Sequence, residues 1–313
     1  MKVLIVCGAN QPNFNFKTTW SFVDEQMQSL KSHGVEFEIF LIKGRGLFGY
    51  LENLSALRSK IKSGQFDIVH AHYGLSGMLS VLQRQTPVIT TFHGSDINIF
   101  SQNIISAIVT RLSQWNIFVS NRIYSKALLK PTKNFSVIPC GVNLELFKPM
   151  DKLEARKLLK MDRDKKYLLF PSAFDNKVKN FPLAKDALNM LNDVIPLELK
   201  DRSREEVNLL LNASDALLMT SEMEGSPQVI KEAMACNCPI ISVDVGDVKD
   251  VIGETDNCFV VERNPKQIAD KISQTLESSQ RTNGRENIEK LNLSVVGIKI
   301  YEIYNDLNRA AIQ

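Results

Sequence analysis

The chain has 313 residues, of which 44% are hydrophobic and 23% charged, an ordinary composition for a globular protein. This length favours two domains, because single α/β cores seldom grow much beyond about 200 residues. No run of about 18 apolar residues occurs, so we expect no membrane-spanning helix. The opening MKVLIVCG is typical of a buried strand and not of a signal peptide.

Cysteine usage and charge indicate the compartment and the partners. The five cysteines are odd in number and scattered, as in proteins of a reducing compartment, so we expect a cytoplasmic protein. The spacing of Cys236-Asn-Cys238 is not that of a zinc or redox pair, and we expect no metal there. Residues 1–145 carry 14 Lys or Arg against 8 Asp or Glu, whereas the remainder carries 24 against 27. The basic first half suggests an acidic partner or an anionic membrane surface, although an ordinary solvated surface explains it equally well.

Apolar runs alternate with amphipathic segments along the first half of the chain. We expect strands at 2–8, 35–42, 67–73, 87–94, 116–120 and 135–141, and helices at 22–34, 50–64, 76–84 and 104–115. Strands that alternate with helices favour a parallel, doubly wound sheet. Gly141 and Pro149 mark a predicted linker over 141–150.

A second alternating set follows the linker. We expect strands at 167–174, 197–200, 215–221, 239–246 and 258–262, with helices at 181–193, 203–214, 227–236, 247–253, 265–279 and 292–310. The predicted fold is therefore α/β, with two doubly wound Rossmann-like domains facing across a cleft. We predict a first domain at 1–145, a second at 146–295, and a final helix at 296–313 that packs back toward the first domain.

The segment EGSPQVIKEAMAC, residues 224–236, carries the chemistry. Ser226 and Pro227 are typical of a helix start, with serine as N-cap and proline at the first helical position. Glu224 then follows a strand end, where open α/β folds bind ligands, and Glu232 lies inside the helix. Free amides at the helix start suit a diphosphate, and the two carboxylates suit hydroxyl groups. A ligand with phosphates between two polyols, such as a nucleotide sugar, would use all three.

In its longer form, SEMEGSPQVIKEAMACNCPIISVDVGDVKDVI, this segment resembles the signature of family 4 retaining glycosyltransferases with the two-domain GT-B fold. DIVHAHYG, PVITTFHGSDIN, VIPCGVNLELFKP and NASDALLMTS follow the same family's order, so the resemblance covers most of the chain from about residue 66. The resemblance implies two Rossmann-like domains and transfer of a sugar from a nucleotide-diphosphate donor with its anomeric configuration kept.

The resemblance also implies roles for individual residues. His93 would contact the transferred sugar, and Glu224 with Gly225 and Ser226 would hold its hydroxyl groups. Lys179 would neutralise the donor diphosphate together with the helix start at Ser226–Pro227, and Glu232 would bind the ribose. The arginine with which the family pairs this lysine is absent from FPSAFD, and Lys177 is a candidate replacement.

Acceptor groups are expected on the first domain, from the Gly8–Asn15 loop, His72 and Asp96. His70 shares a strand face with His72, and a zinc site with His93 is conceivable but lacks an evident fourth ligand. No Asp-x-Asp pair follows a strand, so we expect no metal cofactor: protein charges would meet the diphosphate.

The expected function is therefore a retaining, metal-independent glycosyltransferase of polysaccharide or glycolipid assembly. Its partners would be a nucleotide sugar and a saccharide or lipid-linked saccharide, with no nucleic acid. A nucleotide-sugar epimerase on the same fold and a non-catalytic sugar-nucleotide-binding partner remain alternatives.

Gly44-Arg-Gly46-Leu-Phe-Gly49 matches the dinucleotide-binding fingerprint but follows the second strand and lacks a suitably placed acid. Residues 44–64 are more typical of a basic amphipathic surface. Its Leu47, Phe48, Tyr50, Arg58, Lys60 and Lys62 could touch an anionic membrane at the inner face of the cell membrane. A solvated helix with Leu54, Leu57 and Ile61 in the core is an equally good interpretation.

Overall fold

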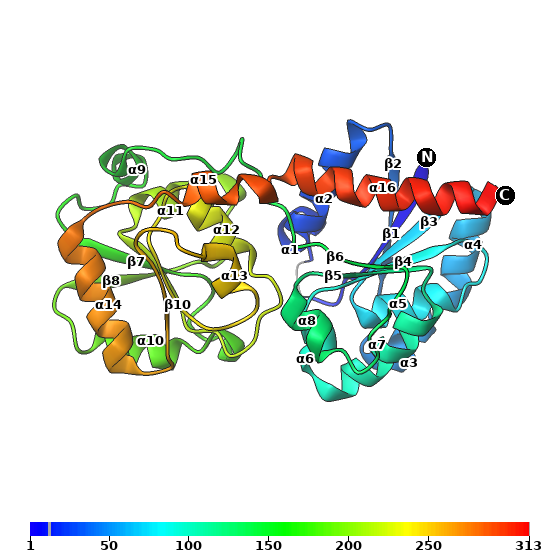
Figure 1. Ribbon diagram of the computed structural model, residues 1–313, viewed down its shortest axis with the longest axis horizontal. Coiled ribbons are helices and arrows are strands. Elements are labelled where there is room, and N and C mark those ends of the chain that lie inside the picture. Colours follow the sequence, from blue (N-terminus) through cyan, green and yellow to red (C-terminus); the bar gives the residue numbers. More distant parts are fainter. Residues whose placement is uncertain (12–13, 313) are drawn as a thin grey trace. The chain divides into compact units, whose positions relative to one another are not determined.

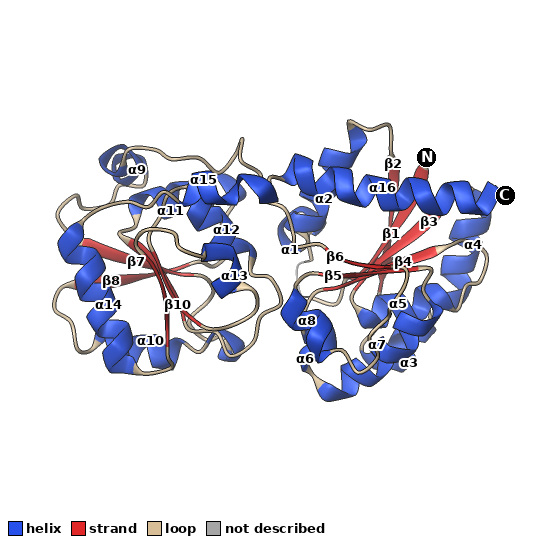
Figure 2. Cartoon of the chain, viewed as in Figure 1, coloured by secondary structure: helices blue, strands red, loops and turns tan. Residues whose placement is uncertain are grey.

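The computed structural model describes residues 1–11 and 14–312, so Pro12 and Asn13 of the Gly8–Asn15 loop lie outside the described residues. The chain divides into two units, one of residues 1–141 with 293–313 and one of residues 142–292. Figures 1 and 2 show each unit as a sheet with helices on both faces. The predicted boundaries after residues 145 and 295 lie a few residues from these divisions.

The first unit contains a six-stranded parallel sheet in the order β2-β1-β3-β4-β5-β6. Its strands are β1 (Lys2–Gly8), β2 (Glu36–Ile42), β3 (Ile68–His72), β4 (Val88–Phe92), β5 (Trp115–Phe118) and β6 (Phe135–Val137). Its helices are α1 (Phe16–Thr19), α2 (Ser21–Lys31), α3 (Gly46–Leu51), α4 (Leu54–Gly64), α5 (Gly74–Val81), α6 (Ser95–Asn98), α7 (Phe100–Leu112), α8 (Asn121–Lys126) and α16 (Leu293–Ile312).

Successive residues of β1 enter two different cores, as the alternation of side chains along a strand requires. Leu4 and Val6 belong to the core shared with α4, α5, α7 and α8, whereas Val3 and Ile5 belong to the core shared with α2 and α16. Both faces of the sheet are thus covered, which confirms the predicted doubly wound architecture and explains why the central strand β1 is apolar from Val3 to Cys7.

The second unit contains a five-stranded parallel sheet in the order β11-β10-β9-β7-β8. Its strands are β7 (Lys166–Phe170), β8 (Val194–Glu198), β9 (Ala216–Met219), β10 (Ile240–Val243) and β11 (Cys258–Val261). Its helices are α9 (Lys152–Leu158), the 3-10 turn η1 (Lys177–Lys179), α10 (Phe181–Leu188), α11 (Arg204–Ala213), α12 (Gln228–Ala235), α13 (Val248–Ile252), α14 (Pro265–Ser278), α15 (Gly284–Ile288) and the 3-10 turn η2 (Glu289–Leu291).

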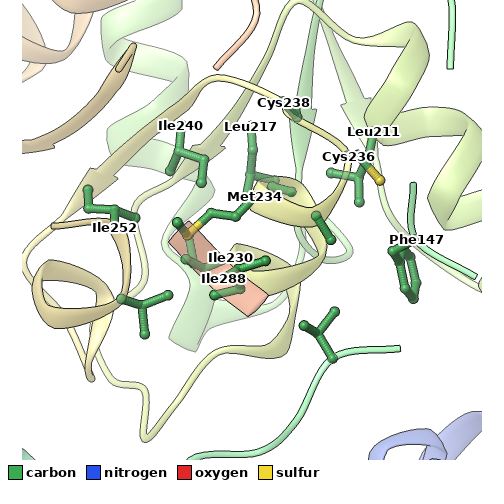
Figure 3. Close-up of a cluster of buried hydrophobic side chains, with 14 of the residues drawn as sticks. Phe147, Leu211, Leu217, Ile230, Met234, Cys236, Cys238, Ile240, Ile252 and Ile288 are labelled. Atoms are coloured by element: carbon green, nitrogen blue, oxygen red, sulfur yellow. The ribbon is translucent and has the colours of Figure 1, made fainter. Parts of the chain in front are cut away.

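Helix α12 is central to one of the two cores of this unit. Figure 3 shows Ile230 and Met234 of α12 among side chains from β9, β10 and α11, with Ile288 of α15 beside them. Cys236 and Cys238 are buried in the same core and their thiols are free. The helix that begins the candidate donor site is therefore anchored along its apolar side.

Two segments differ from the sequence-based expectation. The helix predicted over 50–64 is two helices, α3 and α4, interrupted around Glu52 and Asn53. The predicted linker 141–150 is packed: Val142 and Phe147 are fully buried, and Arg285 donates to the carbonyl oxygens of Leu144 and Phe147 at 2.9 and 2.7 Å. This is why the second unit already begins at Val142.

Helix α16 completes the first unit although its residues follow the whole of the second. Val296, Ile300 and Tyr304 are buried against the sheet, and the Tyr304 hydroxyl lies 2.6 Å from His70 Nδ1 on β3. No helix among the described residues is long and apolar enough to cross a membrane.

Tyr304→Phe should lower the free energy of unfolding by about 1–3 kcal/mol, because it leaves a buried ring nitrogen of His70 without its hydrogen bond. Tyr301→Phe on the same helix is the control and should change stability by less than about 0.5 kcal/mol, because Tyr301 is partly exposed and contacts His33 by stacking. Urea denaturation measures both; equal effects would contradict the importance of the His70 contact.

Candidate active site

The strand order of the second unit creates a switch point between β7 and β9. The chain leaves β7 toward β8 on one side, and β9 lies on the other, so the loops after β7 and β9 diverge at adjacent carboxyl ends. Open α/β sheets bind ligands at such points. Lys179 lies in the loop after β7, and Glu224 lies in the loop after β9.

These two predicted site residues form an ion pair. Lys179 Nζ lies 2.5 Å from Glu224 Oε1, and the two side chains are 23% and 13% exposed. The backbone around them is fixed, because the Thr220 hydroxyl donates to the carbonyl oxygens of Lys179 and Asn180, and the Glu222 amide donates to the Val178 carbonyl. The sequence places Glu224 after a strand end, and the family resemblance places Lys179 just before a helix; neither indicates that the two residues pair with each other.

The arginine that the family pattern would add is absent, and the structure shows which cations surround the site. Lys177 is exposed on the same 3-10 turn as Lys179. Arg263, which follows β11, donates to the carbonyl oxygens of Thr220 and Ser221 at 3.2 and 2.7 Å. Its guanidinium therefore holds the loop after β9. The substitution of Lys177 for the missing arginine stays a prediction.

The start of α12 differs in detail from the prediction. Pro227 is the N-cap and the helix begins at Gln228, one residue later than expected. The Ser226 side chain does not cap the helix; its Oγ lies 2.5 Å from Asp247 Oδ2 and 2.5 Å from Lys231 Nζ. Proline has no N–H, so the amides available at the helix start begin with Gln228.

Buried polar groups hold the loop from Glu224 to Pro227 in place. Lys231 is fully buried although it is charged, and Asp247 is 4% exposed. Burial raises the pKa of the Asp247 carboxyl, and the neighbouring Lys231 charge and Ser226 hydroxyl oppose that rise. Gly246 has a φ of +57°, and a Cβ there would lie 3.0–3.1 Å from Gly225 O, Glu224 Cβ and Pro227 Cδ. Only glycine fits this close approach without displacement.

Lys231→Met should lower the free energy of unfolding by about 3 kcal/mol, since it leaves the buried Asp247–Ser226 pair without its cation. The exposed Lys249 on α13 provides the control, Lys249→Met, which should stay within about 0.5 kcal/mol of the wild type. Chemical denaturation of both variants is the measurement. A Lys231→Met protein as stable as the control would show that the lysine does not brace the loop.

Glu232, the predicted ribose-binding residue, is buried and paired and is not freely accessible. It is 2% exposed, and its Oε1 lies 2.7 Å from Nη2 of Arg204 at the start of α11. The Arg204 guanidinium in turn lies over the Phe147 ring, 4.7 Å from its centroid. Arg204 was not identified as a site residue from the sequence. The Arg204–Glu232 pair gives this end of the unit a defined polar surface.

The first unit has its own switch point, between β1 and β3, and a cavity of about 380 Å³ lies there. Gly8 ends β1 and His72 ends β3, and both line it; their place on the acceptor side stays a prediction. A Cβ on Gly8 would lie 2.3 Å from the Tyr50 hydroxyl, so a larger residue there would have to displace the Tyr50 side chain. The other lining residues are Asn10, Gln11, Thr19, Trp20, Phe22, Tyr50, Tyr73, Leu75, Ser76, Ser95 and Gln102.

The aromatic walls of this cavity were not identified from the sequence. The Trp20 indole donates to the Gly8 carbonyl at 3.0 Å, and its ring lies 5.5 Å from that of Tyr73. Tyr73 has φ +71° and ψ 152°, a strained backbone for a residue with a side chain. Aromatic rings beside neutral hydrogen-bonding groups are suited to a sugar, whose faces are apolar and whose rim is polar.

Three histidines lie in a row beside the cavity. His72 Nδ1 lies 2.9 Å from His93 Nε2, and the rings of His70 and His72 stack at 4.5 Å. His70 is held between Tyr304 and the Thr91 hydroxyl, 2.7 Å from its Nε2, which is a structural role. Burial lowers the pKa of His70 to about 3 and the pKa of His72 well below its usual value, so both are neutral near pH 7.

Asp96 was predicted to meet the acceptor, and the structure gives it another position. Its side chain is buried, and its carboxylate accepts the backbone N–H groups of Gly74, His93 and Gly94 at 3.2, 3.2 and 2.8 Å. Burial raises its pKa to about 6 despite these bonds. We therefore assign Asp96 to positioning the loops that carry His93 and Tyr73, and not to direct contact with an acceptor.

Acidification from pH 7 to 5.5 should destabilise the protein by about 2 kcal/mol. The unfolded chain binds protons on His70 and His72 below its ordinary histidine pKa while the folded chain does not, which costs about 1 kcal/mol each. Asp96 opposes this, because its raised pKa favours the folded state as pH falls, but by less than 1 kcal/mol.

Urea denaturation at the two pH values measures the effect. His70→Gln should make the pH dependence shallower by about 1 kcal/mol, whereas His33→Gln at a partly exposed site on α2's C-terminal side should leave it unchanged. Identical pH dependence in the wild type and the His70 variant would contradict a neutral, buried His70.

No group of three His, Cys, Asp or Glu side chains in residues 1–11 and 14–312 is arranged to hold a metal ion. His70, His72 and His93 are engaged with one another and with the Tyr304 and Thr91 hydroxyls instead.

Two parallel, doubly wound sheets with polar clusters at their switch points define the class as a two-unit α/β protein with candidate sites at its strand ends. The family model for "Glycosyltransferase Family 4" matches residues 4–146, and that for "Glycosyl transferases group 1" matches residues 191–291. The chain therefore belongs to the family 4, group 1 glycosyltransferases, as the motif predicted.

Individual relatives agree with this assignment. The putative teichuronic acid biosynthesis glycosyltransferase TuaC of Bacillus subtilis is 24% identical over 238 residues, and the match spans 66% of this chain and 60% of TuaC. Sucrose-phosphate synthase of Thermosynechococcus elongatus has the same fold, with a TM-score of 0.85 at 17% identity over 99% of each chain. The Anabaena protein HepE, solved in complex with UDP, has a TM-score of 0.75 at 15% identity, and the match spans 98% of this chain and 100% of HepE.

Proposed function

We propose that the protein transfers a sugar from a nucleotide-diphosphate donor to a hydroxyl group of a saccharide or lipid-linked saccharide, with retention of the anomeric configuration. The observation that carries the proposal is the Lys179–Glu224 pair, a cation and a carboxylate 2.5 Å apart at the switch point of the second unit. Family membership and the likeness to a UDP-binding structure support the same assignment.

Lys179 supplies the charge that the leaving group needs. As the bond from the anomeric carbon to the diphosphate breaks, negative charge grows on the diphosphate, and a fixed ammonium group stabilises it more than the intact donor. The N–H groups of Gln228 and Val229 at the start of α12 add a second source of positive potential. When the diphosphate engages Lys179, the Glu224 carboxylate is released to accept hydrogen bonds from sugar hydroxyls.

The nucleotide end of the donor is assigned to Glu232 with Arg204. Glu232 accepts ribose hydroxyls in this proposal, and Arg204, stacked on Phe147, shares the carboxylate and holds it in place. A carboxylate has two oxygens that accept several hydrogen bonds, so it can accept from ribose hydroxyls in addition to one guanidinium. Arg204 also adds a planar cation beside which a nucleotide base can stack.

The acceptor is assigned to the cavity of the first unit, where aromatic rings and neutral polar groups suit a sugar ring. His93, held by its 2.9 Å contact with His72, is assigned to the transferred sugar. Since burial keeps His72 neutral, this pair adds hydrogen-bonding groups without adding charge. For retention, the acceptor oxygen attacks the face from which the diphosphate departs, and its proton passes to the departing phosphate oxygen.

Lys179→Ala and Glu224→Gln should each reduce turnover by about 10²–10³-fold with the fold intact, since each removes a group that acts on charge or hydroxyls at the reacting centre. Matched controls are Lys185→Ala on α10, the helix that follows the loop of Lys179, and Glu222→Gln in the loop of Glu224; both residues are exposed, and both variants should retain activity within about threefold. Release of nucleoside diphosphate from UDP, GDP, ADP and dTDP sugars, followed with a saccharide acceptor, is the measurement.

A thermal-shift series against the same donors in EDTA separates binding from turnover. A donor that raises the midpoint in EDTA, with the rise lost in Lys179→Ala, supports a donor site that uses protein charges and needs no divalent metal. Donor binding without any turnover would contradict the proposed catalysis and favour a binding partner. A shift that requires added Mg²⁺ would contradict the metal-independent arrangement.

A further inference from the structure

Helix α7 carries large apolar side chains on its outward side. Phe100 is 70% exposed, Ile104 and Ile108 are 47% exposed, and Leu112 is 44% exposed. Residues four apart lie on one face of a helix, so these side chains form a continuous stripe over the length of α7. Single exposed apolar residues are ordinary, but a stripe of this kind indicates a contact surface.

The inward side of the same helix is polar, which reverses the usual arrangement. Asn103, Ser106 and Thr110 are buried, together with Val109. The Ser106 hydroxyl donates to the Asp96 carbonyl, and the Asn103 amide donates to the carbonyl oxygens of Ile97 and Lys126. Packing within the first unit therefore accounts for the polar side of α7 and leaves its apolar side without a function in the fold.

A second exposed segment is bonded to the buried polar side of α7. The Leu128 amide donates to Asn103 Oδ1 at 3.1 Å, which fixes the segment after α8 against α7. Leu128 and Leu129 are 53% and 36% exposed. We call the combined surface the α7 patch; it consists of Phe100, Ile104, Ile108, Leu112, Leu128 and Leu129.

The charge around the α7 patch has one sign. Residues 97–144 contain no Asp or Glu, but they contain Arg111, Arg122, Lys126, Lys130 and Lys133. Arg111, Lys126 and Lys130 are exposed, and Lys126 Nζ donates to a neutral oxygen, Asn98 Oδ1, at 3.0 Å. Aliphatic side chains flanked by cations are the composition that binds an anionic lipid surface.

We propose that the α7 patch docks the protein on an anionic membrane surface, with the apolar stripe entering the headgroup region and the cations facing lipid phosphates. A second copy of this chain fits less well, because a symmetric contact would place five cations opposite the same five. This proposal concerns binding to lipid alone and does not depend on the assignment of the donor site.

The location differs from residues 44–64, where the sequence suggested a membrane surface. Leu47 and Tyr50 pack against the core, and Tyr50 also lines the cavity of the first unit. Arg58 donates to the Leu82 carbonyl, and Lys60 pairs with Glu38. Of the apolar residues named there, Phe48 is the one that is largely exposed, at 83%.

Co-sedimentation of the full chain tests the proposal, with vesicles of phosphatidylcholine alone and of phosphatidylcholine with phosphatidylglycerol in a three-to-one ratio. Ile104→Ser combined with Ile108→Ser should lower the partition coefficient on the anionic vesicles by at least about tenfold, since apolar burial drives insertion. Arg111→Gln, Lys126→Gln and Lys130→Gln together should lower it about a hundredfold, at about fivefold per cation.

Helix α9 of the second unit offers matched controls. Leu153→Ser with Leu158→Ser removes two exposed leucines, 47% and 58% exposed, and Lys157→Gln with Lys160→Gln removes two exposed lysines. Both should bind as the wild type does. Thermal midpoints within a few degrees of the wild type show that every variant is folded.

Binding to anionic but not neutral vesicles, lost in the α7 variants and kept in the α9 variants, supports the proposal. Equal loss in both helices, or no binding by the wild type, overturns it. Light scattering after size exclusion provides a third readout: a dimer that the Ile104→Ser, Ile108→Ser variant dissociates would assign the patch to a second copy and overturn the lipid assignment.

Discussion

Right-handed crossovers between parallel strands determine where this protein can build a site. In each unit the first strand lies between two others: β1 between β2 and β3, and β7 between β8 and β9. The loops after β1 and β3, and those after β7 and β9, therefore turn away from one another at the carboxyl ends of the strands. Gly8 and His72 meet at this point in the first unit, and Lys179 and Glu224 in the second. Gly8 and His72 are 64 positions apart in the sequence and Lys179 and Glu224 are 45 apart, so strand order brings each pair together.

The sequence was sufficient for the architecture and for the residues that follow strand ends. Apolar runs with the right length give the strands, and the motif from Glu224 to Ala235 places a candidate donor site. The sequence was insufficient where the burial and the partners of a polar side chain depend on the folded structure. Asp96 looks like an exposed acid in FHGSD, but three backbone N–H groups enclose it. Lys231 looks like a solvated helix residue, but it is fully buried against Ser226.

Long-range contacts explain the other misses. Trp20 lies between α1 and α2 and Tyr50 lies on α3, and no local pattern indicates that they enclose one cavity with Tyr73. The apolar residues of α7 have the spacing of a core-facing helix, and periodicity alone cannot tell which side of a helix faces the protein. The available signal was the composition of residues 97–144, where acidic residues are absent.

The position of α16 has a consequence for the order in which the chain folds. The second unit lies inside the sequence of the first, because residues 142–292 separate the sheet of the first unit from the helix that closes one of its cores. During synthesis the sheet leaves the ribosome early, but the part of its apolar face that α16 covers stays open until Val296, Ile300 and Tyr304 emerge. The unit whose sheet is translated first can therefore complete this core only after the whole of the second unit has been translated.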